Sequence, residues 1–255
     1  MAKKKVVKEK KKKILFFDIE TSHSLAAIFS LFNDSGIPHS SVITEWAIIS
    51  IAYKFQGDKK TTVLMSDLGK NRSVISEIDD RRILEKFSKV LNEADVVVGH
   101  NSDRFDLKKI NTRLIRHKLG PIKPNIKKVD TLKIAKRNFA FMSNRLDYIS
   151  KYLGYGGKMS TPNGLWIKVL MGDKKAVKIM GEYNARDVEE LENVYNELID
   201  YDLLASVKVE DPNRPCCREC GSKNNIVSRK KASAVTGLFA TQYQCYDCNK
   251  YFTVK

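Results

Sequence analysis

The stretch Ile14-Leu15-Phe16-Phe17-Asp18-Ile19-Glu20-Thr21 (residues 14–21) carries the strongest fold signal in the chain. Its apolar run is short and ends at an acidic residue, which is typical of a buried strand. Residues two apart in a strand point to the same face of a sheet, so the carboxylates of Asp18 and Glu20 share one side. We therefore expect a core strand that presents two acids at the place where α/β proteins usually carry their chemistry.

The segments that follow alternate between strand-like and helix-like patterns. Strands are predicted over 46–55, 61–65, 95–99 and 129–131. Helices are predicted over 79–92, 103–119, 144–153 and 173–204. Irregular connections are predicted over 22–45 and 154–173, the latter with five glycines and a proline. Strands that come first and then alternate with helices favour an α/β fold in which helices flank a mixed sheet.

Composition bounds the class of protein. The 255 residues are 42% hydrophobic and 30% charged, which is enough to bury a core. No apolar run approaches the ~20 residues of a membrane helix. The basic N-terminus is followed by only the short run 14–17 before Asp18, which is too short for a secretory signal. We expect no membrane association and a cytoplasmic location.

The net charge of +16 is concentrated at the two ends. Residues 1–13 hold eight lysines and one glutamate, and residues 212–255 hold eight basic and two acidic residues. The 198 residues between them carry 30 basic and 27 acidic groups. Basic ends suit a polyanion such as nucleic acid. A solvated, disordered tail that aids solubility is an equally good interpretation of residues 1–13.

Further acidic residues occur in places that match Asp18 and Glu20. Asp106 lies in the first turns of the helix after the buried strand 95–99, and Tyr183 and Asp187 are four apart on a helix and share a face. Gathered carboxylates repel one another unless cations neutralise them, and hard divalent ions prefer oxygen ligands. Each group alone is weak, because Asp106 could simply favour a helix N-terminus and the last two could be a core tyrosine and a surface acid. Their order along the chain favours one metal site.

Three motifs resemble those of a known family. LFFDIET (15–21), VGHNSDRFD (98–106) and YNARD (183–187) are similar to the three motifs of the DEDD, or DnaQ-like, 3′–5′ exonuclease superfamily in its tyrosine type. The segments 130–132 and 145–154 also resemble family elements, so the likeness covers roughly residues 14–200. It implies a ribonuclease H-like fold with a mixed five-stranded sheet. The layout is similar to uncharacterised exonuclease-like proteins of phages and bacteria.

The resemblance also implies roles for individual residues. Asp18, Glu20, Asp106 and Asp187 would hold two Mg²⁺ or Mn²⁺ ions, and Tyr183 would orient the attacking water. Residues that would contact the substrate are Thr21, Asn101 and Phe105. The tyrosine-type motif requires no histidine, so we interpret His100 as a structural loop residue.

Two C-x-x-C pairs near the C-terminus predict a second metal site. Cys217 and Cys220 form one pair, Cys245 and Cys248 form the other, and 24 residues lie between the pairs. No histidine lies in this region, so four thiolates would hold one structural Zn²⁺ in a zinc ribbon with strands over 223–232 and 239–244. Two redox pairs are the competing interpretation, and Cys216 is left as a spare thiol.

These patterns together predict a metal-dependent 3′–5′ exonuclease. The expected organisation is a basic tail (1–13), a catalytic domain (14–205), a linker (206–215) and a zinc ribbon (216–255). Single-stranded DNA is favoured as substrate by likeness to proofreading domains, and a replication or repair protein could act as partner in trans. The alternatives are a ribonuclease of the same fold and a non-catalytic nucleic-acid-binding adaptor.

Overall fold

The structure is a computed structural model. Its chain forms two compact units, one of Met1–Lys136 with Ala140–Tyr195 and one of Arg137–Phe139 with Asn196–Lys255. The residues that it describes are 12–30, 36–68, 73, 75–156, 160–202, 217, 222, 224–232 and 239–254. The predicted linker 206–215, Cys216 and Cys220 lie outside these residues.

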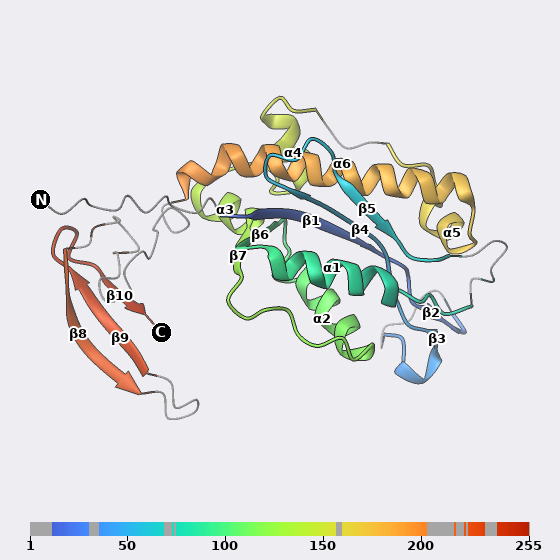
Figure 1. Cartoon of the computed structure of the whole chain (residues 1–255), viewed down its shortest axis with the longest axis horizontal. Coiled ribbons are helices and arrows are strands. Elements are labelled where there is room, and N and C mark those ends of the chain that lie inside the picture. The colour runs from blue at the N-terminus through green and yellow to red at the C-terminus, as the bar shows by residue number, and fades with distance from the viewer. Residues whose placement is uncertain are drawn as a thin grey trace, which may run out of the picture. The chain divides into compact units, whose positions relative to one another are not determined.

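A five-stranded sheet in the order β5-β4-β1-β6-β7 forms the centre of the first unit (Figure 1). β1 runs antiparallel to β4 and parallel to β6, while β4 pairs antiparallel with β5 and β6 pairs parallel with β7. The predicted mixed sheet is therefore confirmed. The strands are β1 (Ile14–Thr21), β4 (Ile48–Phe55), β5 (Thr62–Met65), β6 (Val96–Gly99) and β7 (Lys127–Asp130).

Helices cover both faces of this sheet, as Figure 1 shows. Below the sheet in that view lie α1 and α2, which bury their apolar faces against Leu15, Phe17 and Ile19 of β1. α6 lies on the other side, where Tyr195 meets Phe16 edge to face with 5.2 Å between ring centroids. The helices are α1 (Arg81–Glu93), α2 (Asp106–Arg116), α3 (Thr131–Asn138), α4 (Leu146–Tyr152), α5 (Leu165–Leu170) and α6 (Lys174–Leu198).

The alternation of β1 therefore separates two tasks. Its odd-numbered residues face the core under α1 and α2, and its even-numbered residues face α6. Asp18 and Glu20 follow Phe16 on this second side. The strand thus directs both carboxylates toward the helix that carries Tyr183 and Asp187.

Two predicted connections contain regular structure. Residues 22–45 include the two-stranded ladder of β2 (Leu25–Ala26) and β3 (Val42–Thr44) and the short 3₁₀ helix η1 (His39–Ser41). Residues 154–173 include α5, which the glycine content of the segment concealed. This helix forms because Leu165 and Val169, four apart, are buried against Met180 and Tyr183 of α6.

The second unit contains a three-stranded antiparallel sheet in the order β10-β9-β8. β8 (Asn225–Ala232) and β9 (Phe239–Cys245) agree with the predicted strands, and β10 (Tyr251–Val254) adds one that was not predicted. Tyr243 and Phe252 stack with 5.5 Å between ring centroids and form part of its small core. In the described part of the chain, no helix combines the length and the apolar character that crossing a membrane requires.

Candidate active site

The three predicted motifs bring their carboxylates together in the first unit. Carboxylate oxygens of Asp18, Glu20 and Asp187 all lie within 4.8 Å of one another. The first two come from β1 and the third from α6, so Asp18 and Asp187 are 169 positions apart in the sequence. This convergence is the central feature of the site.

Asp106 approaches the same group from the start of α2. It is almost fully buried, and its Oδ1 accepts a hydrogen bond from the backbone N–H of Ile19 at 3.3 Å. The register of β1 with β6 ends at Phe16 and Val98, so this carboxylate takes the place of a sheet partner for β1. Burial raises the pKa of Asp106 to about 7, and the charge of Asp130 adds to the effect.

Burial and the mutual repulsion of the acids both act on this cluster. The pKa of Asp18 is raised well above its ordinary value, first by desolvation and then by the charges of Asp106, Glu20 and Asp187. A cluster of carboxylates of this kind binds cations that neutralise its charge, and oxygen donors suit Mg²⁺ or Mn²⁺. The donor set therefore fits a divalent-metal centre.

Tyr183 stands beside these carboxylates on α6. Its ring is buried against Trp166 of α5 in an edge-on arrangement with 6.1 Å between ring centroids, and its hydroxyl hydrogen-bonds Asp187. Desolvation raises the pKa of Tyr183, and the charges of Asp187 and Glu20 raise it further. The phenol consequently keeps its proton and serves as a hydrogen-bond donor.

A buried pair of polar residues orients Asp18, and sequence reasoning missed both of them. The Asn184 side-chain amide donates from Nδ2 to Asp18 Oδ2 at 2.7 Å, and the Ser50 hydroxyl donates to Asn184 Oδ1 at 2.7 Å. Both Asn184 and Ser50 are fully buried. Asn184 lies inside the motif YNARD next to Tyr183, which was the available signal. Ser50 is 134 residues away on β4 and gave none.

The loop between β6 and α2 carries two of the three residues expected to contact substrate, Asn101 and Phe105. Asn101 adopts a left-handed backbone with φ 62°, and its N–H donates to Asp130 Oδ1 at 2.8 Å. Gly99 leaves room for this turn, because a Cβ there would lie 2.4 Å from Cβ of Ser102. Phe105, directly before Asp106, has 41% of its surface exposed.

Thr21 and His100 occupy different settings. Thr21 ends β1 directly after Glu20 and pairs with Ile48 of β4 across a bulge. The ring of His100 lies within hydrogen-bond distance of Thr131 Oγ1 and of the carbonyl oxygen of Asn144, each at 2.9 Å. Burial lowers the pKa of His100, and the ring joins the loop after β6 to the start of α3 and to the segment before α4. This geometry agrees with a structural histidine.

A cleft of about 560 Å³ opens beside Asp187. Its walls come from the loop after β6, from α3 and from the beginning of α4, and they include both basic and acidic groups. Among the lining residues are His100, Asn101, Lys136, Arg145 and Asp147. The cluster of carboxylates thus borders, through Asp187, a cleft large enough for a small ligand.

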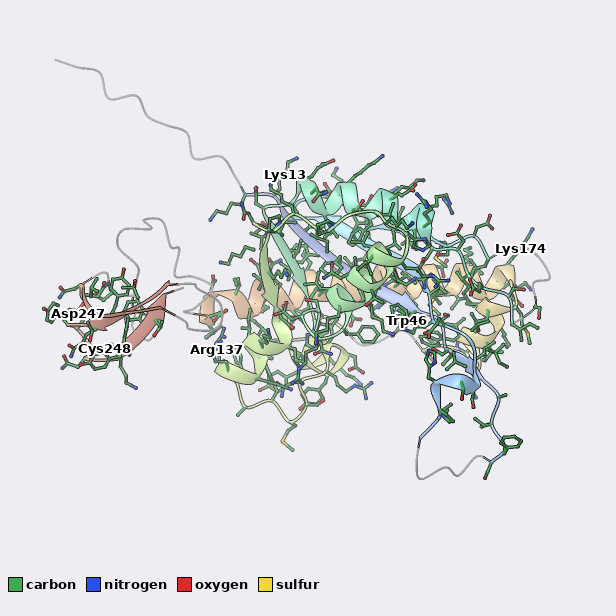
Figure 2. All side chains as sticks on the ribbon, turned by 90° about the horizontal axis from the view of Figure 1, so that it is seen from below. Lys13, Trp46, Arg137, Lys174, Asp247 and Cys248 are labelled. Atoms are coloured by element: carbon green, nitrogen blue, oxygen red, sulfur yellow. The ribbon has the colours of Figure 1, made fainter. Side chains whose placement is uncertain are left out.

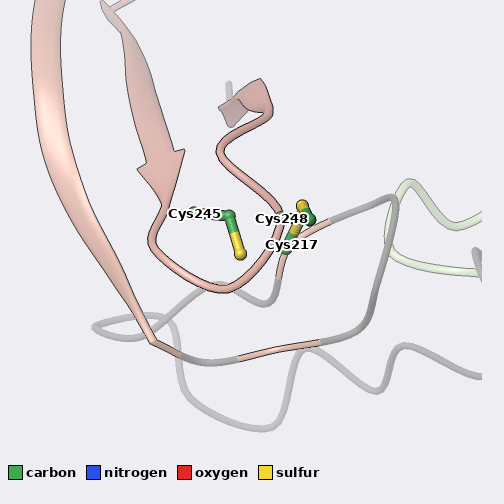
Figure 3. A group of neighbouring side chains, drawn as sticks. All are labelled: Cys217, Cys245 and Cys248. Atoms are coloured by element: carbon green, nitrogen blue, oxygen red, sulfur yellow. The ribbon is translucent and has the colours of Figure 1, made fainter.

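The second unit holds a separate cluster of cysteines, which Figure 3 shows around the turn that follows β9. Sulfur atoms of Cys217, Cys245 and Cys248 all lie within 4.8 Å of one another, and those of Cys217 and Cys248 are 3.5 Å apart. That separation suits two thiolates on one zinc ion at ~2.3 Å each. Asn249, which closes the second pair, has φ 57°, as the tight turn requires. The cluster is compatible with a zinc ribbon.

The fold and the cluster of carboxylates define a nucleic-acid hydrolase of the ribonuclease H-like type, a class that uses divalent metals. Residues 51–199 match the family model RNase_H_2, described as RNase_H superfamily, and the chain belongs to this superfamily. The match includes the second and third motifs and begins after β1. A comparison with curated protein sequences finds no significant match.

Among solved structures, the chain is similar to the family B DNA polymerase from the hyperthermophilic archaeon Pyrobaculum calidifontis. The TM-score is 0.53 at 20% identity, over 77% of this chain and 25% of the polymerase chain. The similarity at this identity is one of fold, and it spans a quarter of the polymerase's length. Together with the family match, it supports the resemblance to the DEDD type.

Proposed function

We propose that this protein is a metal-dependent 3′–5′ exonuclease that acts on single-stranded DNA. The observation that carries the proposal is the convergence of Asp18, Glu20 and Asp187, with Asp106 and Tyr183 beside them. Three motifs distant in the sequence meet at one cluster. A binding module without catalysis would have no need for so much unfavourable like-charge repulsion.

Two divalent ions held by Asp18, Glu20, Asp106 and Asp187 would supply charge neutralisation at the attacking water and at the leaving oxygen. The Tyr183 hydroxyl keeps its proton, because burial and acidic neighbours raise its pKa, and donates it to Asp187. Its oxygen would then accept a hydrogen bond from the attacking water and so orient it. Asn184 holds the Asp18 carboxylate in one orientation through the 2.7 Å bond. As the water oxygen bonds to phosphorus it loses a proton to solvent, and the bond from phosphorus to the 3′ oxygen of the preceding nucleotide breaks. That oxygen takes up a proton and becomes the new 3′ hydroxyl, and a nucleoside 5′-monophosphate is released.

The cleft beside Asp187 supports an assignment to the terminal nucleotide. Lys136 and Arg145 place positive charge on its wall, and Asn101 and Asn144 add polar groups. Cationic side chains attract backbone phosphates, while amide groups can bond to a base or sugar. Phe105 and Thr21 lie next to two of the carboxylates and would complete the substrate contacts.

A degradation ladder tests this proposal. The full chain would be incubated with 5′-labelled single-stranded DNA and RNA of equal sequence, with Mg²⁺ or Mn²⁺ and beside Asp18→Ala. Stepwise shortening of the DNA that is lost in the variant is the expected result. Shortening of RNA alone would identify a ribonuclease. Binding of both strands without cleavage would overturn the enzymatic proposal in favour of an adaptor.

We further propose that the C-terminal region is a zinc ribbon with Cys217, Cys220, Cys245 and Cys248 as ligands, joined through the linker 206–215 to a catalytic domain of residues 14–205. The clustering of three of these sulfurs supports it, and Cys220 would complete the tetrahedron. Metal analysis of the purified protein should find one zinc per chain, reduced in Cys245→Ser. An equal zinc content in that variant would contradict the ligand assignment.

Likeness to a DNA polymerase supports an action beside a replication or repair protein. Co-purification with a polymerase from the source cells, tested with and without nuclease treatment, would examine this partner. Loss of the association after nuclease treatment would indicate a shared nucleic acid in place of protein contact.

A further inference from the structure

The outer face of α2 continues the candidate site beyond Asp106. Phe105 and Lys109 are four apart and lie on one side of this helix, the side next to the start of β4. The Phe105 ring is 41% exposed, and the Lys109 ammonium lies 5.4 Å from its centroid. An exposed aromatic ring and a cation therefore stand together directly after the carboxylates.

Trp46 fixes the position of that cation. The Lys109 ammonium lies 3.5 Å from the centroid of the Trp46 ring, well within the range of a cation–π contact. Trp46, labelled in Figure 2, packs against the core, and its carbonyl accepts a hydrogen bond from Arg113 at 3.3 Å. The packed ring therefore holds the Lys109 ammonium in position.

The setting of Lys109 favours an anionic ligand. Burial lowers the pKa of this lysine, while the charge of Glu45 acts against that shift. A partly desolvated ammonium gains more from a new anionic partner than a fully hydrated one does. The carboxylate of Glu45 stabilises the charged form of this lysine.

We propose that Lys109, seated on Trp46, binds a backbone phosphate of the single strand adjacent to the cleavage site, beside Phe105, whose substrate contact the family resemblance already implies. The inference deepens the proposed function and rests on it. Lys109 lies three positions after Asp106, about 4.5 Å further along the helix axis, so a strand cut at the carboxylates can place a neighbouring phosphate beside it. Aromatic stacking combined with a phosphate contact is the usual mode for single strands without sequence preference.

Salt-dependent binding separates a phosphate contact from a structural role. Binding of fluorescein-labelled oligothymidylate to the full chain would be followed by anisotropy in EDTA, so that no cleavage occurs, between about 50 and 200 mM KCl. Each phosphate contact to a single strand contributes about 0.7 to the slope of log K against log salt concentration. The variants are Lys109→Gln and Trp46→Leu. Lys108→Gln, the exposed neighbour on the same helix, is the matched control because it removes the same charge.

Lys109→Gln should weaken binding about three- to tenfold and lower the slope by about 0.7, while Lys108→Gln should change the slope by much less. Trp46→Leu should weaken binding with the lysine still present, because its support is lost. In cleavage assays Lys109→Gln should raise KM and leave kcat near the wild-type value. Equal slopes for the two lysine variants, in a wild-type protein that binds and cuts, would overturn the phosphate contact alone. A wild-type protein that neither binds nor cuts would overturn the proposed function itself.

Discussion

The two aspartates Asp80, at the start of α1, and Asp18, within β1, have very different charged neighbours. Asp80 is completely buried, and Arg113 grips both of its oxygens at 2.7 and 2.8 Å. The backbone N–H of Ile48 and the ring of His117 complete the set at 2.9 and 2.6 Å. Asp18 instead lies among Asp106, Glu20 and Asp187, all of the same charge.

The comparison teaches which cluster is built to accept something from outside. Asp79, Asp80 and His117 lie close enough together to suggest a metal site, but the arginine fork already neutralises Asp80. The Asp18 cluster has like charges in place of such a fork, so divalent cations are the natural counter-charge. One region is closed by its own side chains, and the other is open to a ligand.

The largest expected effect is the loss of activity in Asp18→Asn. This change removes a proposed metal ligand and should lower kcat by at least about 10³-fold, of the order seen when a central catalytic group is lost. It also removes a repelling charge, so the variant should be as stable as the wild type or more stable in EDTA. Activity on labelled DNA and urea unfolding would measure the two effects. Asp95→Asn, an exposed acid before β6, should change neither.

Asp80→Asn should do the opposite. It leaves the nearly buried Arg113 without its counter-charge, and breaking a buried pair costs about 3–5 kcal/mol. Urea unfolding would detect the loss, and a change below about 1 kcal/mol would contradict the structural role. Glu77→Gln, which breaks the exposed pair with Arg116, is the matched control and should cost at most about 1 kcal/mol.

The pH dependence of stability distinguishes the clusters further. Asp106 has a pKa of about 7 in the folded protein against an ordinary value of 3.8, so the folded state binds the extra proton between these values. The free energy of unfolding in EDTA should therefore fall by a few kcal/mol as pH rises from 4 to 7 and level off above 7. Asp106→Asn should flatten this decline, and Mg²⁺ should oppose it because the ion stabilises the charged form. A decline of equal size in the variant would assign it to other groups.

The smallest effects concern the support of Asp18. Asn184→Ala removes the donor to Asp18 and should lower kcat about 10- to 100-fold with little change in KM, and it should raise the Mg²⁺ concentration needed for half-maximal activity. Ser50→Ala should show the same pattern at smaller amplitude, since it acts one bond further away. Steady-state kinetics at several Mg²⁺ concentrations would measure both. An unchanged Mg²⁺ requirement in Asn184→Ala would reduce the residue to a packing role.

Local patterns in the sequence predicted the strands and helices that depend on neighbouring residues. The apolar run 14–17, the helical spacing of α1 and α2 and the shared face of Tyr183 and Asp187 follow from strand and helix periodicity. The short helix α5 escaped because its stability comes from burial against α6, while its flanks are rich in glycine. Connections across long sequence distances, such as Asp80 with Arg113 or Ser50 with Asn184, leave no periodic trace.

The alternation of β1 has a consequence for how this chain can vary. One face of the strand carries Leu15, Phe17 and Ile19 into the core, and the other carries Asp18 and Glu20 to the site. Deleting or inserting a single residue between Phe16 and Asp18 would exchange the two faces, burying the acids under α1 and α2 and presenting apolar side chains to α6. A substitution on β1 alters one side chain, but a change in the length of the strand would move every following side chain to the opposite face of the sheet.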